Sequence, residues 1–284
     1  MIPNRVRDNV WLASYPKSGN TWMRIALITL QNGGKPIDLG SMVNNIGILL
    51  AARHRFDMAL DIDSSDLSAE EVLLLRPKVY GFMDTQARET TIWKIHDCWQ
   101  RTSDGEALFP EEVTAASIYL VRDPRDVAVS FAHHFGMEVD EAIALMADPD
   151  YAVAAGIRSG HHHLPQTYSD WSGHVTSWID RSGLAPLVIR YEDMLADFAA
   201  VLRQTSATLG WTSSEAAIAG TVAATRFDRL RDEEKAGNFP ETPGGGRRFF
   251  RRGMAGGWRD TLNPAQVEQI ERDHGEVMYR LGYL

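Results

Sequence analysis

Cysteine is almost absent from this chain, and so are long apolar runs. Cys98 is the single cysteine among 284 residues, which excludes an intramolecular disulfide framework and is typical of a reducing compartment. No apolar run approaches the length of a membrane span, and the N-terminal sequence MIPNRVRDNVW lacks the apolar core of a secretory signal. These absences predict a cytoplasmic protein that does not act at a membrane.

Positive charge is also scarce, and it is unevenly placed. The chain carries 29 Lys and Arg against 38 Asp and Glu, a formal net charge of −9, which argues against nucleic acid or an anionic membrane as a partner. The densest basic stretch is RRFFRR at residues 247–252. An acidic chain with one local basic cluster favours a small polyanionic ligand over a polyanionic polymer.

The chain has neither internal repeats nor a low-complexity linker. Its 44 % hydrophobic and 24 % charged residues are ordinary for a globular protein. The Gly- and Pro-rich residues 239–246 are interpreted as a mobile loop inside one domain rather than as a boundary. The sequence therefore predicts one domain over residues 1–284.

Short apolar runs alternate with helical patterns along the chain. The alternation predicts a three-layer αβα fold around a central, mostly parallel sheet, with ligands at the carboxyl ends of the strands. Capping residues mark the helix starts, as where Asp123 precedes Pro124. The predicted strands are residues 10–14, 91–95, 117–121 and 187–191. Two helices are predicted over residues 20–30 and 124–135, and a third begins with a capping box at Ser68. The last predicted helix begins at Asn263-Pro264 and ends at Gly282.

The octet YPKSGNTW, residues 15–22, joins the first predicted strand to the first helix. A helix N-terminus offers N–H groups to an anion, and Gly19 lets the backbone approach it. Lys17 adds a positive charge, and Ser18 and Thr21 add hydroxyl donors. Because the lysine precedes the glycine, the order G-x-x-x-x-G-K-[ST] is absent, and an ordinary ATP or GTP loop is not predicted. The pattern predicts a P-loop-like phosphate cradle.

The whole octet resembles the loop that grips the 5′-phosphosulfate of 3′-phosphoadenosine 5′-phosphosulfate (PAPS) in the cytosolic-type sulfotransferase family. Asn20 stands where the usual family form has threonine, and it keeps a hydrogen-bonding side chain at the helix start. The segment LVRDPRDVAVS, residues 120–130, resembles the family segment in which an arginine and a serine hold the 3′-phosphate. The resemblance assigns those roles to Arg122 and Ser130.

A third segment, RRGMAGGW at residues 251–258, resembles the family's late R-K-G-x-x-G-D-W, which closes over the same 3′-phosphate. Arg252 replaces lysine and keeps the charge, whereas Gly257 replaces aspartate, which predicts a looser loop. Tyr191 in YEDM and the segment Thr225-Arg226-Phe227 resemble family positions around the adenine. The resemblance implies PAPS contacts from Lys17, Ser18, Gly19, Asn20, Thr21, Trp22, Arg122, Ser130, Tyr191, Thr225, Phe227, Arg251, Arg252 and Gly253.

The chemistry falls to Lys94 and His96, which resemble the family's K-x-H with its catalytic histidine. Strand alternation puts both side chains on one side, and a neutral imidazole is available near pH 7. The resemblance implies that His96 takes the proton of an acceptor hydroxyl, while Lys17 and Lys94 stabilise the leaving 3′-phosphoadenosine 5′-phosphate (PAP). No metal is required. Asp97-Cys98 stands where the family often has Leu-Pro, a departure in the local backbone.

Several alternatives stay open. An ATP-dependent small-molecule or nucleoside kinase and a non-catalytic nucleotide-binding protein are the competing functions. The acceptor is expected to be a small molecule with a hydroxyl or amine, and residues 41–60 and 137–168 are expected to shape its pocket. His161, His162 and His163 are adjacent, so they cannot all face one metal ion from regular structure. The family's dimer segment is matched only by Arg259 and Glu268, which leaves the oligomeric state open.

Overall fold

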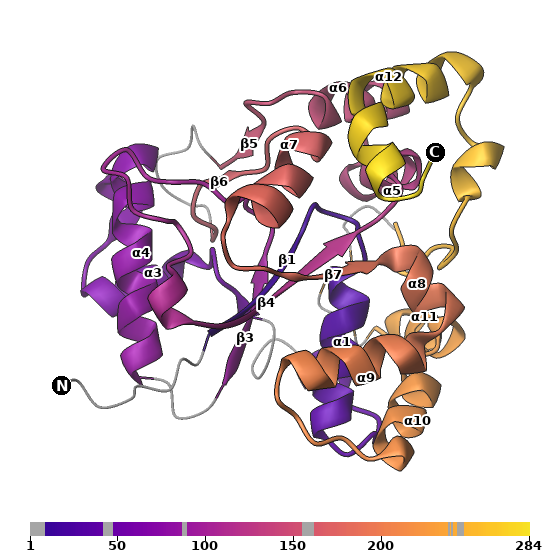
Figure 1. Ribbon diagram of the computed structural model, residues 1–284, viewed down its shortest axis with the longest axis horizontal. Coiled ribbons are helices and arrows are strands. Elements are labelled where there is room, and N and C mark those ends of the chain that lie inside the picture. Colours follow the sequence, from indigo (N-terminus) through magenta and orange to yellow (C-terminus); the bar gives the residue numbers. More distant parts are fainter. Residues whose placement is uncertain are drawn as a thin grey trace. The chain divides into compact units, whose positions relative to one another are not determined.

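The computed structural model describes residues 9–41, 48–86, 90–154, 162–237, 239, 241–242 and 247–284, and it contains a five-stranded sheet (Figure 1). The strand order is β2-β3-β1-β4-β7, and β3 pairs in parallel with both β1 and β2. The expected α/β class with a central parallel sheet is confirmed, as are the four predicted strands. The strands are β1 (Asn9–Ser14), β2 (Ile48–Leu49), β3 (Thr91–Ile95), β4 (Thr114–Val121) and β7 (Leu187–Arg190).

Contacts divide the chain into two compact units. Unit 1 comprises Met1–Tyr15, Gly47–Tyr119 and Asp148–Leu187. Unit 2 comprises Pro16–Ile46, Leu120–Ala147 and Val188–Leu284. The chain passes from unit 1 to unit 2 directly after β1, between Tyr15 and Pro16.

Unit 1 carries α3 (Arg53–Leu60), α4 (Ala69–Gln86), α7 (Trp171–Thr176) and the short antiparallel pair β5 (Ala152–Val153) and β6 (Gln166–Thr167). Helices α3 and α4 lie side by side (Figure 1). The predicted capping box at Ser68 is confirmed, because its Oγ accepts from the N–H of Glu71 and its own N–H donates to the Glu71 carboxylate. Helix α7 continues without a break into a π-helical turn, η4 (Ser177–Arg181).

Unit 2 is mostly helical. Asp123 caps α5 through the N–H of Arg125, and Asn263 forms a capping box at α12, so both predicted helix starts are confirmed. Tyr191 was predicted to end a strand, but β7 stops at Arg190 and Tyr191 opens α8, whose first turn carries acidic residues that suit a helix N-terminus. The helices are α1 (Asn20–Gln31), α5 (Pro124–Phe135), α6 (Val139–Met146), α8 (Tyr191–Ala196), α9 (Phe198–Thr208), α10 (Glu215–Ala224), α11 (Phe227–Lys235) and α12 (Pro264–Arg280).

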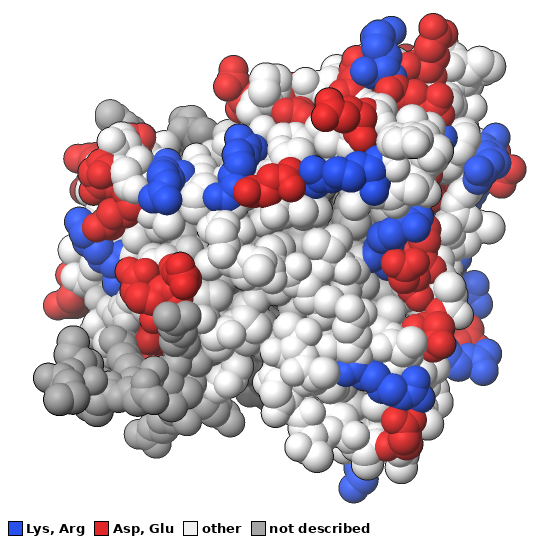
Figure 2. Space-filling model, viewed as in Figure 1, with Lys and Arg blue, Asp and Glu red and all other residues white. Residues whose placement is uncertain are grey.

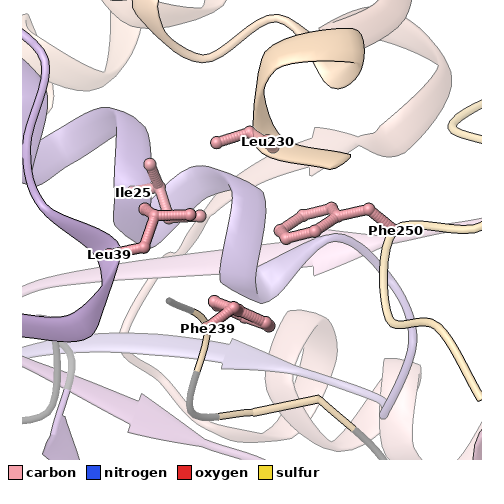
Figure 3. Close-up of a cluster of buried hydrophobic side chains, with 5 residues drawn as sticks. All are labelled: Ile25, Leu39, Leu230, Phe239 and Phe250. Carbon is pink, nitrogen blue, oxygen red and sulfur yellow. The ribbon is translucent and has the colours of Figure 1, made fainter. Parts of the chain in front are cut away.

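A hydrophobic cluster ties the first helix of unit 2 to its late basic segment (Figure 3). Phe250 belongs to the RRFFRR stretch, and it packs with α1 and α11 inside this cluster. The Glu234 carboxylate of α11 also accepts the N–H groups of Phe249 and Phe250. Because large apolar side chains stabilise mainly by burial, the cluster anchors the arginines on either side of them. Its buried members are Ile25, Leu39, Leu230, Phe239 and Phe250.

Acidic and basic side chains are interspersed over the face that Figure 2 draws. That face carries no broad field of one sign. Across the described residues, no helix combines the length and the apolar character that crossing a membrane would need.

Candidate active site

The loop between β1 and α1 has the backbone of an anion cradle. Lys17 and Gly19 both take left-handed conformations, with φ 71° and φ 101°. A Cβ on Gly19 would lie 2.8 Å from Cδ2 of Tyr191, so glycine is required by space as well as by φ. Ser18 is fully buried, and its hydroxyl has no hydrogen-bond partner among the described residues. A buried hydroxyl left over at a helix N-terminus fits the oxygen of a bound anion.

The hydroxyl of Thr21 is engaged by a carboxylate in this structure. It donates to Oε2 of Glu241 over 2.9 Å, and the buried guanidinium of Arg24 forms an ion pair with the same carboxylate. Sequence reasoning assigned Thr21 to the cofactor and missed both Arg24 and Glu241. The spacing of Thr21 and Arg24, three residues apart on one helix face, was the signal available.

Arg122 joins three of the segments singled out from the sequence. Its Nη1 donates to the carbonyl of Lys17 over 3.3 Å, and its Nη2 donates to the carbonyl of Met254 over 3.0 Å. The guanidinium carbon lies 4.3 Å from the ring centroid of Tyr191. Its Nε is buried without a hydrogen-bond partner among the described residues, which leaves a donor for a further ligand.

Positive charge is concentrated around this arginine. Burial, then the charges of Arg252 and Arg122, lower the pKa of Arg251. Burial, followed by the charge of Arg251, outweighs a hydrogen bond and lowers the pKa of His133. Lys17 adds a 4.2 Å contact from Nζ to the ring of Phe249. Positive charges gathered at one place in an acidic chain favour the binding of an anion such as a phosphate.

The late segment, residues 251–258, is held by Asp126 of α5. Its carboxylate accepts the N–H of Gly256 over 2.6 Å and that of Trp258 over 2.9 Å. Gly253 has φ 61°, and a Cβ there would meet the ring of Phe227 at 2.1 Å. The sequence predicted a loose loop from Gly257, but the N–H groups on either side of that residue are both anchored. Sequence reasoning also missed Asp126, which anchors this segment.

The residues assigned to the adenine gather around Trp22. Its Nε1 donates to the carbonyl of Thr225 over 3.0 Å, and its ring lies 5.8 Å from that of Tyr191 and 4.4 Å from that of Phe198. The hydroxyl of Thr225 donates to Thr221 inside its own helix. Ser130 is half-buried in α5. Asn20 is buried at the first position of α1.

His96 and Lys94 belong to unit 1, whereas the residues assigned to PAPS belong to unit 2. Nδ1 of His96 lies 2.9 Å from the carbonyl oxygen of Ser14, which can only accept a hydrogen bond. Nδ1 therefore carries the proton of the neutral ring, and the lone pair is on Nε2. Lys94 lies in β3, where it is in register with Leu12 and Leu49.

Two segments expected to shape the acceptor pocket meet each other in unit 1. Ala52 forms an antiparallel bridge with His163, and the N–H of Arg53 donates to the carbonyl of His162 over 2.9 Å. His161, with residues 42–47 and 155–160, lies outside the described residues. In the described part of the chain, no group of three or more His, Cys, Asp or Glu is arranged to hold a metal ion.

Cys98 follows His96 closely but is not a nucleophile. Its side chain is buried, and burial, with a smaller effect of the Asp97 charge, raises the pKa of the thiol to about 12. A thiol rather than a thiolate is therefore present near neutral pH, and thiols react poorly.

Comparison with known proteins decides the family. Residues 107–282 match the family model described as the sulfotransferase domain, which is more than half of the chain. The chain belongs to the sulfotransferase family. Mouse sulfotransferase 1A1 is 23% identical over 280 residues, covering 95% of this chain and 84% of that protein. Dog sulfotransferase 1A1 is 26% identical over 172 residues, which is 58% of this chain and 55% of the dog protein.

Solved sulfotransferase-fold structures share the architecture of this family member. Mouse SULT7A1 complexed with PAP superposes with a TM-score of 0.59 at 20% identity, covering 96% of this chain and 85% of that one. Retinol dehydratase in complex with androsterone and inactive cofactor PAP superposes with a TM-score of 0.62 at 22% identity, covering 95% and 80%. The predicted P-loop-like α/β fold of the family is thereby confirmed.

Proposed function

We propose that this sulfotransferase uses PAPS to sulfate a hydroxyl or amine of a small molecule. The observation that carries the proposal is the position of Arg122, which bonds the phosphate loop at Lys17 and the late arginine segment at Met254. A donor with phosphate groups at both ends of a ribose needs two anion sites joined in this way. ATP has no 3′-phosphate and would leave the second cluster of arginines unused.

Each part of the donor has a group in unit 2 that suits it. The N-terminus of α1, with Lys17 and the buried hydroxyl of Ser18, suits the 5′-phosphosulfate. Arg122 with the arginines of residues 251–252 suits the 3′-phosphate, since a guanidinium forks onto phosphate oxygens. Further assignments from the family resemblance are Gly19, Asn20, Thr21, Ser130 and the Gly253 N–H for phosphate oxygens, and Trp22, Tyr191, Thr225 and Phe227 for the adenine.

In the proposed transfer step, the tautomer of His96 makes Nε2 the atom that accepts the proton. The acceptor oxygen attacks sulfur, its proton passes to Nε2 of His96, and the sulfur bond to the bridging oxygen breaks in line. The electron pair of that bond leaves with PAP, where Lys17 and Lys94 stabilise the new phosphate charge. The hydrogen bond from Nδ1 to the carbonyl of Ser14 supports the positive imidazolium that this step forms.

Thermal unfolding with PAP, ADP and ATP in parallel tests the donor assignment. PAP at 100 times its Kd is expected to raise the Tm by about 5 °C, because binding to the folded state adds about 2.7 kcal/mol. ADP lacks the 3′-phosphate and should give a much smaller rise at the same concentration. A rise with ATP or ADP but not with PAP would overturn the proposal in favour of a kinase.

Removing the charge of Glu241 is expected to strengthen PAP binding. Glu241→Gln keeps an acceptor for Thr21 but frees the charge of Arg24, so the Kd for PAP should fall by about threefold to tenfold. Isothermal titration of PAP measures the change. Glu215→Gln is the matched control, since Glu215 pairs with Arg203 on the exposed surface of the same unit. An unchanged or weaker affinity in Glu241→Gln alone would show that this carboxylate does not oppose the donor.

A further inference from the structure

The peptide groups that follow His96 are held from outside the sheet. The pairing of β1 with β3 ends at Ala13 and Ile95, so His96 lies one residue beyond it. Asp97, Cys98 and Trp99 come next, and all three are buried. The strand alone therefore does not fix the backbone that carries the imidazole.

Helix α7 and the π-helical turn after it supply the missing support. His174, Ser177 and Trp178 are spaced i, i+3 and i+4, which places them on one face of the helix. Each of them bonds a different peptide group of the segment after β3. Nε2 of His174 donates to the carbonyl of His96 over 3.1 Å, and Nε1 of Trp178 donates to the carbonyl of Asp97 over 3.0 Å. Oγ of Ser177 accepts the N–H of Trp99 over 2.9 Å.

The partners of His174 leave it one tautomer. A carbonyl oxygen accepts, so Nε2 carries the hydrogen that is donated to His96, and Nδ1 accepts from the hydroxyl of Tyr119 over 2.8 Å. His174 is fully buried, and burial lowers its pKa to about 3, so the ring stays neutral near pH 7. The hydrogen bond from Tyr119 to Nδ1 thus favours the tautomer of His174 in which Nε2 carries the hydrogen donated to His96.

The opposite side of the segment is held by an ion pair. Nη1 and Nη2 of Arg76 in α4 donate to the Asp97 carboxylate over 2.8 and 2.7 Å, and both side chains are buried. Asp97 and Cys98 stand where the family often has Leu-Pro, and the ion pair supports the backbone at this departure. A backbone clamped from α4 and from α7 has little freedom to turn.

We propose that His174 is a positioning residue for His96, holding its carbonyl so that the imidazole keeps its hydrogen bond to Ser14 and presents Nε2 to the acceptor. The inference rests on the proposed role of His96 as the base. The inference gives the two nitrogens of the His174 ring different roles. The donor at Nε2 acts on His96, whereas the acceptor at Nδ1 serves only to fix the tautomer.

Two substitutions separate these roles. In His174→Gln the side-chain amide nitrogen reaches about as far as Nε2 and can still donate to His96. In His174→Asn the side chain reaches only as far as Nδ1, so the carbonyl of His96 loses its donor. If His174 merely fills space, His174→Gln and His174→Asn should have the same effect on His96.

The first readout is nuclear magnetic resonance of protein labelled with nitrogen-15 in histidine, which reports the tautomer of each ring without any acceptor. Wild type should show His96 protonated at Nδ1 and His174 at Nε2. His174→Asn should lose the single tautomer of His96, and His174→Gln should keep it. Unchanged His96 signals in His174→Asn would overturn the inference.

The second readout is turnover of radiolabelled PAPS with 2-naphthol and with 1-butanol as acceptors. His174→Asn should lower kcat by about tenfold, with the Kd for PAP unchanged, and His174→Gln should restore most of it. Thr114→Val is the control, because it removes the buried partner of Trp11 in the same unit without touching residues 96–99. Equal losses in all three variants would reduce His174 to a structural residue.

A second variant tests the inference if His174→Asn does not fold. Tyr119→Phe removes the hydroxyl that fixes the tautomer of His174, so it should weaken the single tautomer of His96 and lower kcat by about threefold. No change in either readout for Tyr119→Phe would count against the inference. Retained turnover in His96→Ala would overturn the role of His96 as base, while the resonance experiment would still report on its positioning.

Discussion

Replacing His96 by alanine is expected to lower kcat for sulfuryl transfer by about a thousandfold, because a positioned general base contributes factors of this size. The Kd for PAP should stay within about twofold, since none of the residues assigned to the donor is altered. Single-turnover transfer from radiolabelled PAPS measures the first quantity, and isothermal titration measures the second.

The control for that substitution is Lys78→Ala. Lys78 is an exposed residue on α4 of the same unit and takes no part in the proposed step. Its kcat should equal that of wild type. If His96→Ala turned over at the wild-type rate, a different group would have to accept the proton, and the tautomer argument would lose its chemical meaning.

Arg122→Ala is expected to weaken PAP binding by about a hundredfold, because a charged hydrogen bond to phosphate is lost together with the link between two loops. The Kd for ADP should rise much less, since ADP lacks the 3′-phosphate. The quantity to measure is therefore the Kd for ADP divided by the Kd for PAP. This ratio should be large in wild type and should fall toward one in Arg122→Ala.

Arg122→Lys gives the matched comparison. It keeps the charge but loses the fork, and should fall between wild type and Arg122→Ala. Arg203→Ala removes an exposed arginine of the same unit, and should leave the ratio unchanged. Equal weakening of PAP and ADP in Arg122→Ala would mean that Arg122 supports the loop at Lys17 and does not select the 3′-phosphate.

Local signals in the sequence were sufficient for most element starts. Asp123 before Pro124 predicted α5 to the residue, because an N-cap side chain and a proline at the first helical position both act within one turn. The start of the first helix was likewise predicted at Asn20, where α1 begins. Such features depend only on neighbours in the chain, so one sequence is enough to find them.

Contacts between distant residues escaped the sequence for a physical reason. Arg24 meets Glu241 across 217 positions, and His174 meets His96 across 78. Periodicity and capping describe residues within a turn or a strand, and they carry no information on which distant carboxylate or carbonyl will be the partner. The supports of the site were therefore missed, and the roles given to the donor-binding groups and to the base stay predictions.

The buried thiol of Cys98 makes this chain convenient for site-specific labelling. Burial raises the pKa of this thiol to about 12, so the thiol stays protonated near neutral pH and is expected to react slowly with maleimides. A cysteine introduced at an exposed position such as Met58 would then carry a fluorophore alone, without removal of the native residue. Such a label would report on local changes around α3 in otherwise unaltered protein.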